Sequence, residues 1–109
     1  MTRVKLPTDR HGKTSKLKLG VESLYIVANC DEDGNLRELF GYSDDVNIKA
    51  ELDGLSGLCS IALQYGTPLE KLAGFLRGRK SEPRGIAGQP LSVSDALARI
   101  MLEYVKEEA

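Results

Sequence analysis

The hydrophobic pattern of this chain is densest in its middle, over residues 52–78. From Leu52 onward, apolar residues recur with the spacing of one helix face, at Leu55, Cys59, Ala62 and Leu63. Leu58 and Ile61 make the other face apolar as well. Because a helix that is apolar nearly all round is normally buried, we expect this helix to be fully buried and the rest of the chain to pack around it.

A tight corner and a second helix are expected next. Gly66 can adopt the left-handed conformation that closes a helix. The hydroxyl of Thr67 can accept a hydrogen bond from a free amide, Pro68 suits a position that needs no N–H, and Glu70 can bond back to the Thr67 amide. Gly78 can end this helix, whose apolar stripe consists of Leu69, Leu72, Ala73 and Leu76.

Three strands are expected before the helices. Thr14–Gly20 alternates leucine with lysine, Ser23–Cys30 is rich in β-branched and aromatic residues, and Leu36–Tyr42 alternates again. Between the last two, Asp31–Asn35 has the composition of a hairpin turn, in which Gly34 or the asparagine after it can take positive φ. The pattern therefore predicts consecutive antiparallel strands.

A third helix is expected at the end of the chain, after a loop over Arg79–Leu91. Ser92 has the residue type of a cap, with Asp95 reaching back, and the apolar stripe that follows runs from Val93 to Val105. Met101 and Tyr104 lie on this stripe and are interpreted as core. For the long first helix, caps are offered by Ser43, Asp44 and Asp45.

The predicted order of elements is βββααα. We therefore expect an α+β fold in which a three-stranded antiparallel meander is packed on one face by three helices. The chain has 109 residues, which suits one domain over residues 1–109.

Charge is unevenly distributed along the chain. The formal net charge is -1, but residues 1–20 contain six cationic side chains and one acid, Asp9, so they carry +5 and the remainder carries -6. The segment Met1–Lys13 is polar and is interpreted as a basic, extended arm. Such an arm could meet an acidic partner, a phosphate or the acidic body itself. The absence of aromatic residues from residues 1–20 disfavours a nucleic acid as partner.

The two cysteines, Cys30 and Cys59, lack the spacing of a metal or redox motif. Together with the absence of a signal peptide, they favour a reducing cytoplasm. No apolar run approaches the ~20 residues that span a membrane, so no membrane association is expected.

Two acidic or histidine-containing segments could in principle bind metal. Asp31–Gly34 has a composition that weakly resembles a calcium-binding loop. Because the segments on both sides of it are predicted strands, a hairpin turn is favoured. His11 lacks ligands at zinc spacing and is interpreted as a solvated arm residue. No metal site and no catalytic residue is therefore assigned.

Two basic clusters are candidate anion- or partner-binding sites. The first combines a helix end, a glycine-containing loop and a helix start, at Arg79, Lys80, Arg84 and Ser92. The second lies in or after the arm, at Arg10, Lys13 and Lys16. A solvated basic surface remains the alternative for both clusters.

Four stretches together resemble one known domain, the TSCPD domain, in order and over nearly the whole chain: LPTDRHGKTSKLKLG, YIVANCDEDGNLRELF, LCSIALQYGTPLEKLAGFLRGRKSEPRG and LSVSDALARIMLEYV. The most specific part is SIALQYGTPLEKL, and Glu82-Pro83-x-Gly85 also matches. The motif that names the domain falls on Leu91–Asp95, where Val93 occupies the cysteine position and Ser94 the proline position. A thiol or metal role at that position therefore does not carry over.

The resemblance is closest to the C-terminal region of adenosylcobalamin-dependent (class II) ribonucleotide reductases, and it implies a partner more than a reaction. In those enzymes this domain lies outside the barrel that holds cobalamin, substrate and the radical cysteine, and in some bacteria it is a separate chain that the catalytic chain requires. The resemblance thus implies that adenosylcobalamin belongs to a partner catalytic chain and that this chain binds no cofactor.

Two functions follow as hypotheses. The first is a non-catalytic accessory domain for deoxyribonucleotide synthesis, which docks on a reductase catalytic chain or on nucleotide through the two basic clusters. The alternative is an independent nucleotide-binding homo-oligomer.

Overall fold

A computed structural model describes residues 2–81 and 86–106 of the chain. Its elements follow the order β1 (His11–Leu19), β2 (Glu22–Cys30), β3 (Leu36–Tyr42), α1 (Val46–Gln64), α2 (Leu69–Leu76) and α3 (Val93–Leu102). The strands form one antiparallel sheet in the order β1-β2-β3. The predicted α+β class and βββααα order are therefore confirmed.

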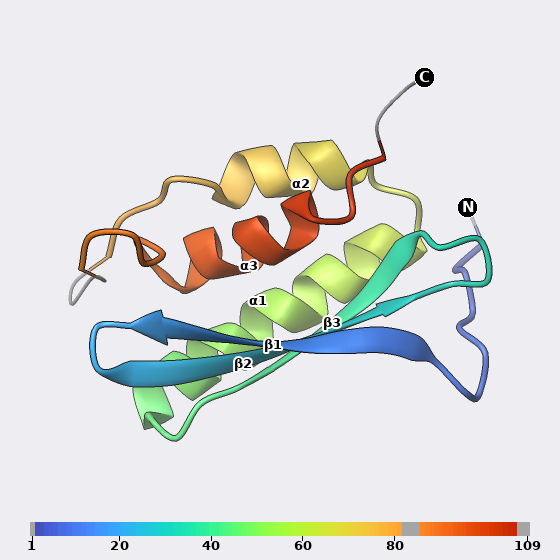
Figure 1. Ribbon diagram of the computed structural model, residues 1–109. Coiled ribbons are helices and arrows are strands. Elements are labelled where there is room, and N and C mark those ends of the chain that lie inside the picture. The colour runs from blue at the N-terminus through green and yellow to red at the C-terminus, as the bar shows by residue number, and fades with distance from the viewer. Residues whose placement is uncertain (1, 82–85, 107–109) are drawn as a thin grey trace.

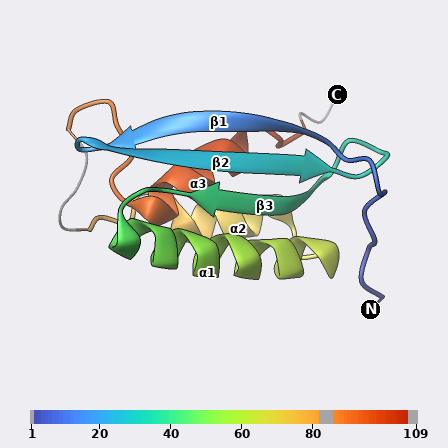
Figure 2. The same cartoon turned by 90° about the horizontal axis from the view of Figure 1, so that it is seen from below.

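The helices leave one face of the sheet open. Figure 1 shows α3 between the sheet and α2, while α1 runs along β3. Figure 2 looks onto the open side of the sheet, with α2 and α3 behind it. α2 packs mainly on α3 and not on the strands. The molecule thus has an open sheet face on one side and α2 on the opposite side.

The fully buried helix is α3, and the prediction that α1 is buried on all sides was wrong. α3 buries almost every residue between Val93 and Met101, because the sheet covers one of its sides and α2 the other. On α1, by contrast, Leu58 is 65% exposed and Ile61 is 48% exposed. The apolar residues of α1 therefore form two faces, of which only one enters the core.

The buried face of α1 is partly polar because it lies against the free edge of β3. Its buried polar residues are Ser56, Ser60 and Gln64. The hydroxyl of Ser60 accepts a hydrogen bond from the Leu39 amide at 2.8 Å, and the Gln64 side-chain amide donates to the Arg37 carbonyl at 3.1 Å. These contacts satisfy the backbone groups of an edge strand that would otherwise be open to pairing with another chain.

The helix ends largely follow the local sequence signals. Asp45 caps α1 by accepting from the Ile48 amide, and Gly66 (φ 95°) closes that helix. The predicted cap at Thr67 was wrong: Pro68 occupies the N-cap position and makes no side-chain cap bond. The Thr67 amide instead donates to the Ala62 carbonyl, which closes α1.

Two predicted boundaries differ from the structure. β1 begins at His11 and not at Thr14, because β2 offers pairing partners as far as Cys30, so the predicted arm is partly strand. Its first residues are exposed and polar, which is why they show no alternation. α3 ends at Leu102, and Tyr104 and Val105 follow in turns whose amides donate to Met101 and Leu102.

The Asp31–Asn35 hairpin turn is confirmed, with Gly34 at φ 81° between β2 and β3. The Asp31 carboxylate accepts from the Asp33 and Asn35 amides and from Arg37 Nε, the last at 2.9 Å. Partial burial by itself raises the pKa of Asp31, but the hydrogen bonds from Arg37 and the two amides outweigh it, so the pKa lies below its usual value.

We expect Asp31→Asn to lower the free energy of unfolding at neutral pH by about 1–2 kcal/mol, since a charge-assisted bond to Arg37 is lost. A carboxylate with a depressed folded pKa stabilises above its unfolded pKa of about 4 and loses that contribution as the pH falls through the folded value. Urea unfolding between pH 7 and pH 2 should therefore show the two proteins converging below pH 4. Asp33→Asn, at an exposed position of the same turn, is the control, and a constant difference at all pH values would contradict the argument.

Candidate interaction surfaces

Of the residues predicted to form a basic cluster after α2, Arg79 and Lys80 are consecutive and exposed. Arg79 donates from Nε to the Phe75 carbonyl at 2.6 Å, and its guanidinium lies 4.1 Å from the centre of the Phe75 ring. Lys80 is exposed next to it. Arg84 lies outside the described residues. Arg79 and Lys80 therefore present two exposed cations just after the end of α2.

Ser92, the fourth member of that cluster, is buried and caps α3. Its hydroxyl accepts from the Asp95 amide at 3.0 Å. The Asp95 carboxylate reaches back, as predicted, and accepts from the Gly78 amide at 2.8 Å and the Leu91 amide at 2.9 Å. Asp95 thus joins the end of α2 to the start of α3. The binding of an anion by Ser92 stays a prediction.

The N-terminal segment packs against the rest of the domain. An acidic partner and a phosphate were the other contacts predicted for it. The Val4 amide donates to the Gln64 carbonyl at 2.8 Å, and Arg3 donates to the Gln64 side-chain oxygen. Arg10 donates to both oxygens of Glu38 at 3.2 and 3.3 Å. Glu38 is buried and also accepts from Asn29 at 2.9 Å, so the ion pair with Arg10 is well anchored.

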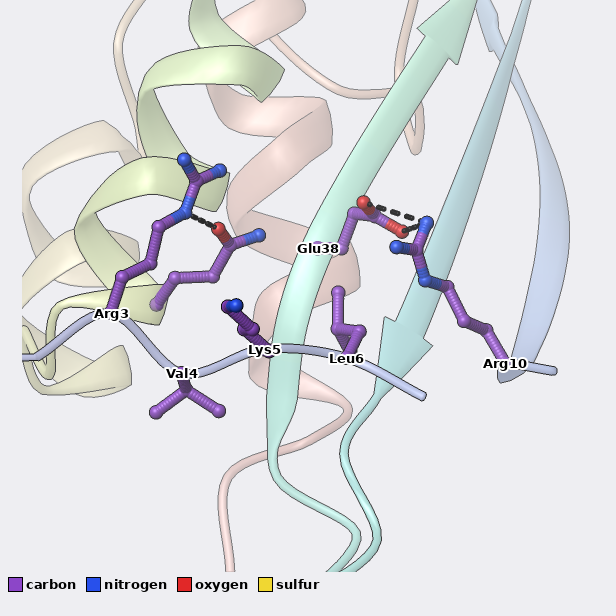
Figure 3. Close-up of a pocket in the computed structure, with 7 residues that line it drawn as sticks. Arg3, Val4, Lys5, Leu6, Arg10 and Glu38 are labelled. Carbon is purple, nitrogen blue, oxygen red and sulfur yellow. Dashed lines mark hydrogen bonds and ion pairs between the residues drawn. The ribbon is translucent and has the colours of Figure 1, made fainter. Parts of the chain in front are cut away.

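The segment encloses an open pocket of about 340 Å³ against α1 and β3. Figure 3 shows Arg3 and Arg10 at its two ends, each pointing to its partner on the body, with Lys5 and Leu6 between them. Three cationic side chains and one acid line the pocket, in the set Arg3, Val4, Lys5, Leu6, Arg10, Glu38 and Gln64. This lining is suited to a small anion.

Lys13 and Lys16 project to different sides of the sheet. Lys13 donates to Glu103 beyond α3 at 3.0 Å, and the hydrogen bond and charge of Glu103 raise the pKa of the Lys13 ammonium. Lys16 lies on the open face, with its ammonium 5.7 Å from the centre of the Tyr25 ring. The structure therefore brings together Arg10 and the N-terminal segment, and it separates Lys13, Lys16 and the Arg79–Lys80 pair from one another.

The two thiols are poor candidates for nucleophiles. Both are free, and Cys59 lies on the buried face of α1. Burial raises the pKa of Cys59, and burial followed by the charge of Asp31 raises the pKa of Cys30. Both thiols are consequently more protonated at neutral pH than a free cysteine.

Sequence reasoning missed the body side of the N-terminal pocket. Arg3 and Gln64 are 61 residues apart, and no local pattern links them. The charge difference between arm and body indicated a contact but not its partners.

Within residues 2–81 and 86–106, no group of three metal-ligating side chains is found, and no helix there is long and apolar enough to cross a membrane.

Comparison with known proteins adds the family context. The family model described as the TSCPD domain matches residues 2–105. The vitamin B12-dependent ribonucleotide reductase of Agrobacterium fabrum is 30% identical over 108 residues, which cover 97% of this chain and 8% of that protein. The protein of the same name from Streptantibioticus cattleyicolor is 29% identical over 105 residues, which cover 94% of this chain and 17% of that protein.

The chain therefore spans only a small part, 8–17%, of these relatives. A third relative with the same name, from Bradyrhizobium diazoefficiens, is 28% identical over 110 residues. No solved structure matches.

Proposed function

The chain belongs to the TSCPD domain family, and from this membership we propose that it is an accessory domain that docks on the catalytic chain of a vitamin B12-dependent ribonucleotide reductase. The observation that supports this most is the match of nearly the whole chain to a small part of each relative. Because the matched segment is a small fraction of each reductase, we propose that reduction itself is carried out by a partner chain. We propose that this chain and the reductase chain act together in the cytoplasm.

The proposal assigns adenosylcobalamin to the partner chain. The best-formed pockets among the described residues measure about 280–440 Å³. That is the lower part of the range, about 300–1,000 Å³, in which drug-sized ligands bind, and a cobalamin is far larger than such ligands. None of these pockets is large enough for adenosylcobalamin, so we assign this chain no part in binding it.

Two basic groups are available for docking, one on β1 and one just after α2. Lys16 and Lys18 belong to β1 and are exposed next to the open face, whereas Arg79 and Lys80 follow α2. We assign the primary contact to the β1 side, where Arg10 and the N-terminal segment also lie, and keep Arg79, Lys80 and Arg84 as a separate anion or partner contact.

Charge reversal tests this assignment. The double variant Lys16→Glu/Lys18→Glu should weaken binding to the host's vitamin B12-dependent reductase chain about tenfold at low salt, mainly through a slower association rate. The matched variant Arg79→Glu/Lys80→Glu should change the affinity less than twofold. Biolayer interferometry at two salt concentrations measures both.

Several results would contradict the proposal. A wild-type chain that does not bind the reductase, or a host genome that encodes no such reductase, would remove the docking function. Binding that depends only on Arg79 and Lys80 would move the contact to the α2 side.

A second function, nucleotide binding, is favoured by the three cationic side chains of the N-terminal pocket. A nucleotide at a hundredfold excess over its dissociation constant should stabilise the fold by about 2.7 kcal/mol. Thermal unfolding with a panel of ribo- and deoxyribonucleotides separates this function from docking alone, which predicts no shift.

A further inference from the structure

α1 carries an apolar stripe that the described chain leaves exposed. Leu58, Ile61 and Tyr65 follow one another at helical spacing and are 65%, 48% and 44% exposed. The opposite side of α1 packs on β3 and the core, and none of these three residues belongs to the core cluster. A stripe of this kind on a surface helix is typical of a site that another surface covers.

The open face of the sheet adds three aromatic side chains. The register places Tyr25 opposite Tyr42 and Val27 opposite Phe40, so all four lie on one face. Phe40 and Tyr42 are each half exposed, and Tyr25 is only slightly less so. Figure 2 shows that no helix lies over this face.

A groove joins the sheet residues to the stripe of α1. It measures about 360 Å³, and its apolar lining includes Phe40 of β3 and Ile61 of α1. Gly57 of α1 also lines it, together with polar and charged residues such as Glu38 and Asp53. No atom lies within 4 Å of a Cβ built on Gly57, so that position is open. We use the name aromatic face for the exposed residues of the open sheet face and of the α1 stripe, of which Phe40 and Ile61 line the groove. Its members are Tyr25, Phe40, Tyr42, Leu58, Ile61 and Tyr65.

The charge beside the aromatic face is positive on the β1 side. The ammonium of Lys16 sits over the Tyr25 ring, and Lys18 is exposed on the same face of β1. Glu38, on the same face, is already neutralised by Arg10. A complementary partner would present an apolar patch with acidic residues along one side.

We infer that the aromatic face is the surface by which this chain packs on the body of a vitamin B12-dependent reductase chain, with acidic residues of that chain facing Lys16 and Lys18. The inference rests on the proposed docking function and names its surface. In the relatives most of the protein lies outside the matched segment, so each of them has a large body available to cover this face. A second copy of the chain is the competing occupant.

The test replaces exposed apolar residues in matched pairs. Phe40→Ser/Ile61→Ser should weaken binding to the host's reductase chain at least tenfold, because a few buried anchor residues carry most of the binding energy of an interface. Phe75→Ser/Val21→Ser removes side chains that are even more exposed, at 67% and 89%, on α2 and on the β1–β2 turn, and it should leave the affinity within twofold. Circular dichroism verifies that both variants are folded.

Leu58→Glu provides a second variant that leaves the sheet untouched, and it too should weaken binding about tenfold or more. Equal affinity of all variants would overturn the aromatic face while the docking function stands, whereas a wild type that does not bind would overturn the docking function itself. Sedimentation equilibrium supplies the remaining outcome: a dimer that Phe40→Ser/Ile61→Ser dissociates would assign the face to a second copy and contradict the inference.

Discussion

Replacing Gly41 with valine is expected to destabilise the fold by about 3 kcal/mol or more, since overpacking a core typically costs 1–3 kcal/mol and this contact is unusually close. A Cβ on Gly41 would lie 2.1 Å from Cγ of Leu52, and the Leu52 side chain is completely buried. The absence of a side chain at Gly41 is what allows α1 to lie so close to β3. Urea unfolding followed by circular dichroism measures the loss.

Leu52→Ala provides the check on this explanation. By itself it should cost about 2–5 kcal/mol by leaving a cavity. Combined with Gly41→Val, it should be less destabilising than the sum of the two by about 1–3 kcal/mol, because the new side chain fills the space. Gly54→Ala, at a helical glycine with nothing within 4 Å of its Cβ, should instead stabilise by about 0.5–1 kcal/mol. Strict additivity of the first pair would refute the close contact.

Ser60→Val is expected to cost about 2–4 kcal/mol, the sum of an unsatisfied buried amide and some crowding. The Ser60 hydroxyl accepts from the Leu39 amide at 2.8 Å and lies within hydrogen-bond distance of the Leu39 and Ser56 carbonyls, at 3.0 and 2.8 Å. The variant leaves the edge of β3 without its partner. For a domain of this size the melting temperature should fall by roughly 8–16 °C.

Ala50→Val, at an exposed position of the same helix, controls for the lower helix propensity of valine and should cost about 0.5 kcal/mol. Ser60→Ala separates the lost hydrogen bond from crowding and should account for at least half of the effect of valine. If the alanine variant were as stable as the wild type, the polar stripe of α1 would not be the feature that completes the edge of the sheet.

The contacts of α1 show where sequence reasoning succeeds and where it stops. Its cap at Asp45 and its end at Gly66 were predictable because each depends on residues within one turn. Its orientation was not, because the pattern offered apolar residues on both sides and polar residues at Ser56, Ser60 and Gln64. The polar side of α1 faces inward because it lies against the edge of β3, and the helix sequence alone does not show this.

The same limit applies to the candidate sites. The basic character of the N-terminal segment was visible in the sequence, and so was the alternation that places Phe40 and Tyr42 on one face of a strand. The pairing of Arg3 with Gln64, and the groove shared by Phe40 and Ile61, depend on contacts between distant elements. The sequence therefore indicated the types of side chain involved but not which of them share a surface.

The proposed docking requires the aromatic face to contact a reductase chain. Hydroxyl-radical footprinting with and without the host's vitamin B12-dependent reductase chain measures side-chain exposure on both sides at once. We predict that oxidation of Phe40, Tyr42 and Tyr65 falls severalfold in the complex while oxidation of Phe75, on α2, stays unchanged. Protection of Phe75 with Phe40 still fully reactive, or no protection at all, would contradict the account.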